Sequence, residues 1–241
     1  MKLPTEKSGI DKRYSSQTFG MIGAPGIGKS SFWGQDDKAL FLDCEGGLNF
    51  IEAMKIPIRS WDNLRDTYAE LHAARDKFPY SVIIIDPIDR VISYAENDII
   101  DRAKVFYKKS EINTIGDIPE GRGWDLRRTA LNKFLQQLET LPCAVAYISH
   151  LNSQKIKSAT GQDYDKLTIS VGGKLGTDLL GWTDHTLHVQ AVQLGDKLRR
   201  TVFTKPTQSK EAKSRGGIIP DGWLWTDNDK ENYNYFRGLF E

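Results

Sequence analysis

The chain has 241 residues, of which 39% are hydrophobic and 27% charged, the composition of an ordinary globular protein. Its 33 Lys and Arg residues nearly balance 32 Asp and Glu residues, so the net charge of +1 excludes nucleic-acid binding driven by overall charge. The start has no apolar signal segment, and no run approaches the roughly 18 apolar residues of a membrane span. We therefore expect a soluble, cytoplasmic protein without a membrane partner, folded as one domain over residues 1–241.

Short apolar segments that alternate with helical or polar stretches predict an α/β fold. The expected strands are residues 17–22, 39–43, 81–86, 143–149, 185–189 and 199–204. The middle segments are continuously apolar, which is typical of parallel strands covered on both faces. Residues 88–106 and 131–138 each place their apolar residues on one helical face. This alternation predicts a mostly parallel central sheet flanked by helices, with C-terminal β-hairpin additions.

The remaining segments complete the predicted organisation. Residues 1–16 are expected to form an N-terminal arm, and the aromatic-rich residues 217–241 a hairpin and helix that pack on the core. Residues 107–123 and 151–170 are polar and are predicted as long loops. Loops of such length in a compact domain are usually functional or mobile.

The strongest motif follows the first strand. Residues 23–30 read GAPGIGKS and fit the pattern G-x-x-x-x-G-K-[ST] between a strand and a helix start. A chance match in such a chain is roughly a one-in-a-hundred event. Lys29 is expected to reach the β- and γ-phosphates of ATP, and the Ser30 hydroxyl to bind Mg²⁺. The predicted nucleotide-binding residues are Gly23, Ala24, Pro25, Gly26, Ile27, Gly28, Lys29, Ser30 and Ser31.

Polar residues follow three of the predicted strands. Asp86 ends the third strand, where a carboxylate beside a phosphate loop is expected to hold Mg²⁺. Asp43 and Glu45 lie on one side of the second strand, and either could act as the general base that activates the attacking water. The alternative for Glu45 is a plain polar turn. His150, after the fourth strand, is placed to sense the γ-phosphate, although a lone histidine is more often structural.

The order of the segments GAPGIGKS, FLDCEGG, VIIID and AYISH resembles the ATPase core of RecA-type recombinases. The resemblance implies a RecA-like P-loop NTPase core over roughly residues 17–216, and it selects Glu45 over Asp43 as the catalytic base. His150 departs from RecA, which has Gln there. The short helix after the loop and the E-G-G after the second strand resemble the phage-encoded RecA-core ATPases, which include the Sak-four type of single-strand annealing protein.

The resemblance also implies contacts with single-stranded DNA through residues 110–123 and 151–170. Lysines in the second stretch can neutralise phosphates, and a tyrosine ring can stack on any base. Asp163 and Asp165 dilute this positive charge, so an ordinary solvated loop is the alternative. The predicted DNA-contacting residues are Lys155, Lys157, Tyr164 and Lys166.

A second basic site stands in the run EAKSRGG at residues 211–217. DnaB-type ATPases complete a neighbour's site with a K-x-R run after a late strand, and AKSRGG resembles it, with Lys213 and Arg215 in the matching places. Two apart on an extended segment, both side chains point to one target. We therefore expect a homo-oligomer in which Arg215, helped by Lys213, reaches ATP on the next subunit. A solvated basic turn is the alternative.

Together these features predict a DNA-stimulated ATPase that binds single-stranded DNA and promotes annealing or strand exchange in phage recombination, in the cytoplasm of the host cell. A single-strand-binding protein is a further expected partner. The rival functions are a ring-forming DNA motor, such as a helicase or loader, a P-loop kinase of a small metabolite, and a nucleotide-gated assembly module.

Overall fold

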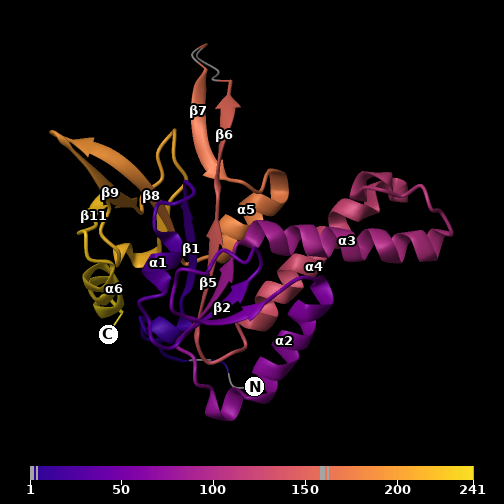
Figure 1. The fold of residues 1–241 in the computed structure, drawn as a ribbon, viewed down its shortest axis with the longest axis horizontal. Helices are drawn as coiled ribbons and strands as arrows, with labels where there is room; N and C mark the ends of the chain where they lie inside the picture. The colour runs from indigo at the N-terminus through magenta and orange to yellow at the C-terminus, as the bar shows by residue number, and fades with distance from the viewer. Residues whose placement is uncertain (1–2, 4, 158–160, 162, 241) are drawn as a thin grey trace.

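The computed structural model describes residues 3, 5–157, 161 and 163–240. Within this part of the chain, nine strands form one sheet in the order β11-β9-β8-β1-β5-β4-β2-β3, with β10 also paired to β8 (Figure 1). The parallel strands are β1 (Thr18–Gly23), β2 (Ala39–Asp43), β3 (Met54–Pro57), β4 (Val82–Asp86), β5 (Ala144–Ser149) and β8 (His185–Leu194). The antiparallel strands are β9 (Lys197–Phe203), β10 (Lys213–Ser214) and β11 (Trp223–Leu224). The predicted α/β class, mostly parallel sheet and antiparallel C-terminal additions are confirmed.

Helices cover both faces of the sheet. Buried residues of two helices pack on one face: α1 (Lys29–Trp33) and α6 (Asp229–Gly238). Buried residues of four helices pack on the other: α2 (Trp61–Ala73), α3 (Ile88–Tyr107), α4 (Arg122–Leu138) and α5 (Gly173–Trp182). All six predicted strands are present, and so are the four predicted helices, α1, α3, α4 and α6, whereas β3, α2 and α5 were not predicted.

Residues 151–170 differ from the prediction. β6 (Leu151–Ile156) and β7 (Tyr164–Ile169) form an antiparallel hairpin that stands away from the sheet (Figure 1). The long loop expected there is therefore wrong for these strands, while residues 158–160 and 162 lie outside the described part. The four central residues of β6 are all exposed, so this strand has no apolar face and its sequence lacks the alternation that marks a half-buried strand.

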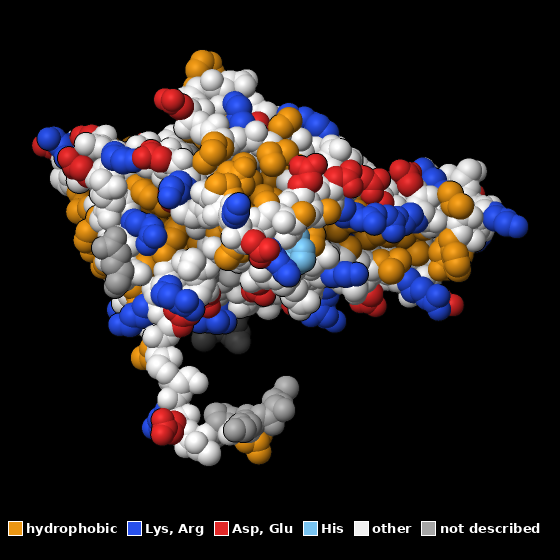
Figure 2. Space-filling model, turned by 90° about the horizontal axis from the view of Figure 1, so that it is seen from below, with side chains coloured by type: hydrophobic (Ala, Val, Ile, Leu, Met, Phe, Trp, Pro, Cys, Tyr) orange, Lys and Arg blue, Asp and Glu red, His pale blue; other side chains and the backbone are white. Residues whose placement is uncertain are grey.

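The segment between α3 and α4 is a long connection, as predicted. Two 3-10 turns, Ile115–Asp117 and Pro119–Gly121, join the helices. Ile112 and Ile118 are buried against α3, so the projecting helical arm has a small core of its own. The long loop expected at 107–123 is therefore confirmed for residues 108–121, although it is more ordered than a plain solvated loop. On the underside of the molecule, Lys and Arg side chains lie beside apolar ones along this arm (Figure 2).

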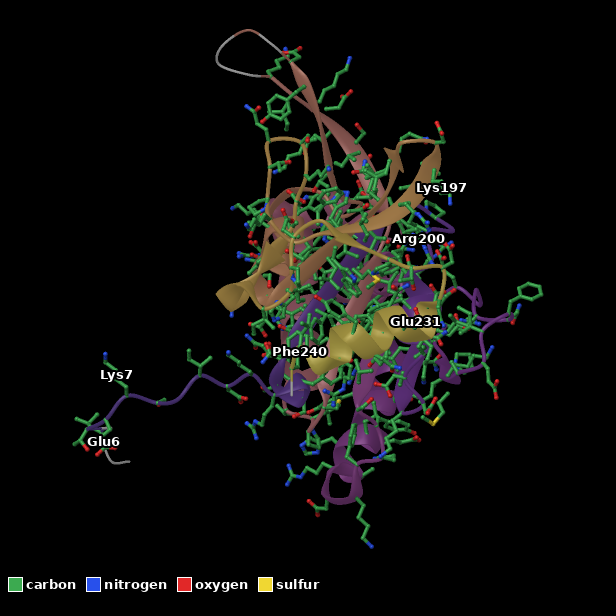
Figure 3. The ribbon with its side chains drawn as sticks, turned by 90° about the vertical axis from the view of Figure 1, so that its left-hand side faces the viewer. Glu6, Lys7, Lys197, Arg200, Glu231 and Phe240 are labelled. Carbon is green, nitrogen blue, oxygen red and sulfur yellow. The ribbon has the colours of Figure 1, made fainter. Side chains whose placement is uncertain are left out.

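The two ends of the chain behave differently. Glu6 and Lys7 lie on an extended segment that leaves the body of the protein (Figure 3). Residues 1–2 and 4 of the expected arm, and Glu241, lie outside the described residues. The C-terminal segment pairs β11 with β9 and packs α6 on α1, with the ring centroids of Phe236 and Phe32 5.3 Å apart. No helix in the described part of the chain is long and apolar enough to cross a bilayer.

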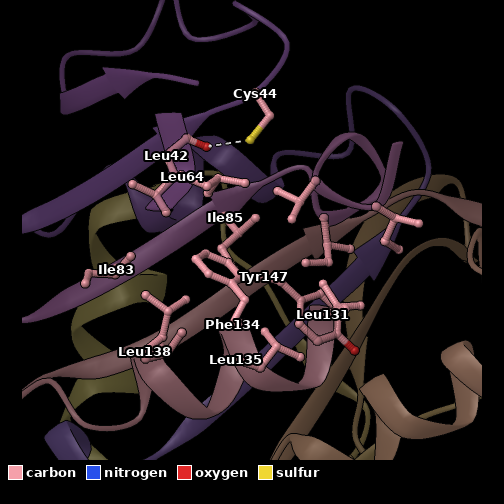
Figure 4. Packing of buried hydrophobic residues seen from close by; sticks show 14 of the residues in the cluster. Leu42, Cys44, Leu64, Ile83, Ile85, Leu131, Phe134, Leu135, Leu138 and Tyr147 are labelled. Atoms are coloured by element: carbon pink, nitrogen blue, oxygen red, sulfur yellow. Dashed lines mark hydrogen bonds between the residues drawn. The ribbon is translucent and has the colours of Figure 1, made fainter. Parts of the chain in front are cut away.

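The core follows from strands that bury both faces. Along β4, Ile83 and Ile85 pack with α2, α3 and α4, while Val82 and Ile84 pack with α1 and α6. Figure 4 shows the first of these clusters, in which Ile85 lies close to Phe134 of α4 and to Tyr147 of β5. This alternation with a period of two fixes the strand register, because a one-residue slip would exchange the faces.

Candidate active site

The phosphate loop joins the end of β1 to the start of α1. Gly26 and Gly28 have φ angles of 75° and 99°, in the left-handed region that favours glycine. A Cβ on Gly28 would also lie 2.5 Å from the Arg200 guanidinium, so the turn is closely covered from β9. The loop therefore holds the open conformation in which backbone N–H groups can surround phosphate oxygens.

Lys29 folds back over this loop. Its Nζ donates to the carbonyl oxygens of Gly23 at 2.8 Å and Ala24 at 2.9 Å, and the side chain is almost fully buried. Burial lowers the pKa of Lys29, and the nearby carboxylates of Asp86 and Asp89 partly oppose this. The ammonium group is thus kept at the loop by neutral acceptors.

Ser30 and Asp86 meet beside Lys29. The Ser30 hydroxyl donates to the Asp86 carboxylate at 2.6 Å. Burial raises the pKa of Asp86, while this hydrogen bond and the Lys29 charge lower it. A hydroxyl and a carboxylate oxygen at this spacing fit Mg²⁺. No group of three metal-binding His, Cys, Asp or Glu residues occurs in the described part of the chain, so Mg²⁺ would need phosphate oxygens as further ligands.

Asp43 and Glu45 are held differently. The Asp43 carboxylate is buried and accepts from the Gly46 backbone N–H at 2.6 Å, which fixes the turn after β2. The Glu45 carboxylate is partly exposed and forms an ion pair with Arg90 of α3 at 3.0 Å. The Asp43 carboxylate is therefore already bonded to the backbone. The Glu45 carboxylate is held only by the exposed side chain of Arg90.

A cavity of about 250 Å³ brings most of the predicted site together. Of the predicted loop residues, Gly23, Ala24 and Ile27 do not line it. The lining residues predicted from the sequence are Pro25, Gly26, Gly28, Lys29, Ser30, Ser31, Asp43, Glu45, Asp86 and His150. The residues thus converge from the phosphate loop and from the carboxyl ends of β2, β4 and β5.

Asp89 is a site residue that was not predicted from the sequence. It sits in the first turn of α3, and its carboxylate accepts from the Ser149 hydroxyl at 3.2 Å, from Ser170, and from the backbone N–H and the ring Nδ1 of His150, both at 3.3 Å. Ser149 and His150 precede β6, and Ser170 follows β7. Asp89 therefore ties both strands of the hairpin to the cavity. No local pattern marked it, because its partners lie 60 to 81 residues away along the chain.

A larger groove continues from the phosphate cavity. It has a volume of about 790 Å³ and shares Ser31 and Ile51 with the cavity. It runs along α1 between the turn after that helix and residues 50–54. Phe50 lies on its rim with a fully exposed ring, 102% of the reference area. An aromatic ring open to solvent beside a groove is a surface on which a flat ligand can stack.

Arg200 also escaped the sequence analysis. Its guanidinium lies over the Trp225 ring at 5.0 Å and bonds Asp229 at 2.7 Å, which fixes it against the phosphate loop at Gly28. Figure 3 shows Arg200 on β9, above the helix that carries Glu231. A single Arg on an antiparallel strand belongs to no sequence motif, so its place beside the phosphate loop could not be predicted. The fold brings it there.

Lys213 and Arg215 lie at the opposite side of the sheet from the cavity, where the parallel strands β1 and β8 begin. Arg215 bonds the Asp184 carboxylate at 2.7 Å, and Asp184 accepts from the Thr18 hydroxyl at the start of β1 at 2.9 Å. The Lys213 ammonium donates to carbonyl oxygens at the end of α5, among them Leu180 at 3.0 Å. Both side chains therefore meet at the end of α5 in their own subunit, and their role in a neighbour's site stays a prediction.

The predicted DNA contacts split over the hairpin. In the β6–β7 register, Lys155 faces Asp165 and Ile156 faces Tyr164, so Lys155 and Tyr164 point to opposite sides. Lys166 shares the side of Tyr164 and is paired with Glu211 at 3.1 Å. Lys157 follows β6 and is exposed. These four residues do not form one surface as the loop hypothesis supposed, and their contact with DNA stays a prediction.

The parallel sheet, the loop between β1 and α1, and the pairing of Ser30 with Asp86 define a P-loop nucleoside triphosphatase. A sequence profile described as an AAA domain matches residues 15–216, and the chain belongs to this family of P-loop ATPases. No curated protein matches the chain. The match supports a nucleotide with Mg²⁺ as the family's ligand. It does not show membership of the narrower family of phage recombination proteins.

Proposed function

We propose that the protein is a homo-oligomeric ATPase that acts on single-stranded DNA, with each ATP bound between two copies. The observation that carries this proposal is the cavity where Lys29, Ser30, Asp86 and Glu45 meet. These residues supply, in one place, a cation for the phosphates, oxygen ligands for Mg²⁺ and a carboxylate for the attacking water.

Each residue has a distinct task in hydrolysis. Lys29 would exchange its bonds to the loop carbonyls for the β- and γ-phosphate oxygens. Ser30 and Asp86 would hold Mg²⁺, which offsets negative charge on the phosphates. Glu45 would take a proton from water, after its ion pair with Arg90 opens. The Arg90 guanidinium would thus pair with the charge of the Glu45 carboxylate until ATP binds.

The nucleoside would occupy the groove beside α1. The acidic residues and His150 of the cavity lining would lie at the γ-phosphate, and the chain of phosphates would then lead back past Ser31. Ser31 and Ile51 line both spaces, and Phe50 stands on the rim. Stacking of the base on Phe50 would then contribute to affinity.

The position of Arg215 favours action on a neighbour. Arg215 lies by the start of β1, and the phosphate loop follows the end of that strand, which has six residues. At roughly 3.3 Å per residue, the two are ~17 Å apart in one subunit, beyond the reach of an arginine side chain. The guanidinium of this exposed side chain would instead leave Asp184 and face another copy, where it would stabilise charge on the transferred phosphate. Lys213 would support it by anchoring the segment to α5.

The DNA part of the proposal rests on exposed basic and aromatic groups. Lys155 and Lys157 on the hairpin are exposed, and the α3–α4 arm presents Phe106 and Trp124, 78% and 52% exposed. Exposed rings between cations are typical of surfaces that bind single strands without sequence preference. The resemblance to phage-encoded annealing proteins adds annealing or strand exchange as the reaction, with a single-strand-binding protein as a further partner.

ATP hydrolysis measured with and without single-stranded DNA tests this proposal. We expect turnover to rise several-fold with DNA and to need Mg²⁺, and we expect the protein to speed annealing of complementary strands. Turnover indifferent to DNA, together with phosphate transfer to a small metabolite, would replace the proposal by a kinase. Unwinding of a forked duplex would favour a motor.

A further inference from the structure

Glu211 links the hairpin to the segment that carries Arg215. Its carboxylate pairs with the ammonium of Lys166 at 3.1 Å and accepts from the hydroxyl of Thr168, both on β7. The Glu211 side chain is only 18% exposed, so both contacts are partly shielded from water. One carboxylate thus holds two side chains of the hairpin at once.

The backbone continues this link toward Arg215. The Leu167 N–H donates to the Ser209 carbonyl at 2.8 Å, and the Glu211 N–H donates to the Leu167 carbonyl at 3.3 Å. The Glu211 carbonyl lies 3.2 Å from Nδ1 of His188 on β8. Two residues later β10 pairs with β8, and the Arg215 N–H donates to the Asp184 carbonyl at 3.0 Å. Residues 209–215 therefore lie between the hairpin and β8.

The same hairpin reaches the subunit's own phosphate cavity at its base. Asp89 accepts from Ser149 and His150 before β6 and from Ser170 after β7, and His150 lines the cavity. The hairpin is thus clamped by Asp89 on the side of its own ATP site. Glu211 clamps it on the side of the residue proposed to serve the neighbour.

We propose that Glu211 is a positioning residue for Arg215: it fixes residues 209–215 to the hairpin and so sets where the guanidinium stands in the neighbouring ATP site. This inference rests on the proposed action of Arg215 across the subunit interface. It implies that loss of Glu211 impairs the arginine side of the composite site and leaves the phosphate-loop side intact.

Mixing variants tests this grouping. Glu211→Ala should bind ATP as the parent does, because its own phosphate loop is untouched, and its turnover should fall about tenfold. Mixed with Lys29→Ala it should regain activity, since an intact loop can then face an intact arginine side. Mixed with Arg215→Ala it should regain nothing, because both variants lack a working arginine side. Should Glu211→Ala not fold, Thr168→Val removes one hydroxyl contact to Glu211 and runs the same mixtures.

Other outcomes overturn the proposal. Unchanged turnover of both variants, or recovery with Arg215→Ala, would mean that Glu211 does not act through Arg215. Failure to recover with Lys29→Ala would place the defect in the subunit's own site, provided that the control mixture of Lys29→Ala and Arg215→Ala recovers. If that control does not recover despite co-assembly, the composite site itself is wrong, and Glu211 loses its proposed role with it.

Discussion

The two edges of the central sheet are built for different purposes. At the carboxyl edge, where the parallel strands end, Lys29, Ser30, Asp86 and Glu45 converge on one cavity from the start of α1, the end of β4 and the turn after β2. At the amino edge, where the parallel strands begin, Arg215 lies beside Asp184 and the start of β1. The first edge holds nearly everything that phosphoryl transfer requires, and the second holds a cation that its own site cannot reach. Under the proposed function, one subunit would carry two halves of a site, which complete each other only between copies.

The largest expected effect concerns the base at the carboxyl edge. Glu45→Gln should leave ATP binding intact and slow hydrolysis by about 10²-fold or more, the scale of a lost general base. Single-turnover hydrolysis with a parallel binding titration measures both. Asp43→Asn is the matched comparison, because Asp43 is committed to the Gly46 N–H. Loss of turnover only in Asp43→Asn would reverse the assignment.

The phosphate loop supplies the next largest effect. Lys29→Ala should raise the dissociation constant for ATP by about 10- to 100-fold, since hydrogen bonds to charged groups are worth about 1.5–3 kcal/mol. Isothermal titration calorimetry measures it. Lys205→Ala, an exposed lysine on the amino-edge side, is the control and should bind as the parent does. Equal affinity in both variants would remove the carboxyl edge as the nucleotide site.

The groove beside α1 gives a smaller effect. Phe50→Ala should weaken ATP binding about tenfold, the scale of one lost stacking contact, and leave tripolyphosphate binding unchanged. Phe106→Ala removes another exposed ring, far from the groove, and serves as the control. A Phe50→Ala variant that binds ATP and tripolyphosphate like the parent would place the base elsewhere.

A buried histidine at the amino edge should make the stability of the protein depend on pH. His185 contacts Ser214 and Gln17 and is fully buried, and burial lowers its pKa to about 4 from an ordinary 6.5. The unfolded chain therefore takes up a proton that the fold resists. The free energy of unfolding should fall by on the order of 3 kcal/mol as the pH drops from 6.5 to 4.

Urea unfolding across that pH range measures this effect, and His185→Gln should flatten it. His188, also buried and with a pKa lowered by burial, adds in the same direction, so the slope of His185→Gln should shrink without vanishing. The same slope in parent and variant would mean that the amino edge does not resist protonation through His185.

The sequence revealed the carboxyl edge better than the amino edge, for physical reasons. A phosphate loop needs fixed residue types at fixed spacing, and parallel strands buried on both faces are continuously apolar, so both leave local signals. The hairpin strand β6 exposes its four central residues and leaves no such signal. Asp89, Arg200 and Glu211 act through partners 45 to 172 residues away in the chain, namely His150, Gly28 and Lys166, and spacing alone does not encode such contacts.

The most direct test of the composite site mixes two variants that are each inactive. Lys29→Ala lacks the carboxyl-edge half and Arg215→Ala the amino-edge half, so each alone should hydrolyse little ATP. Mixed in varied ratios at constant total protein and allowed to co-assemble, they should give an activity that peaks near equal proportions. Activity that stays at the level of the separate variants at every ratio, with co-assembly verified, would contradict a site shared between subunits.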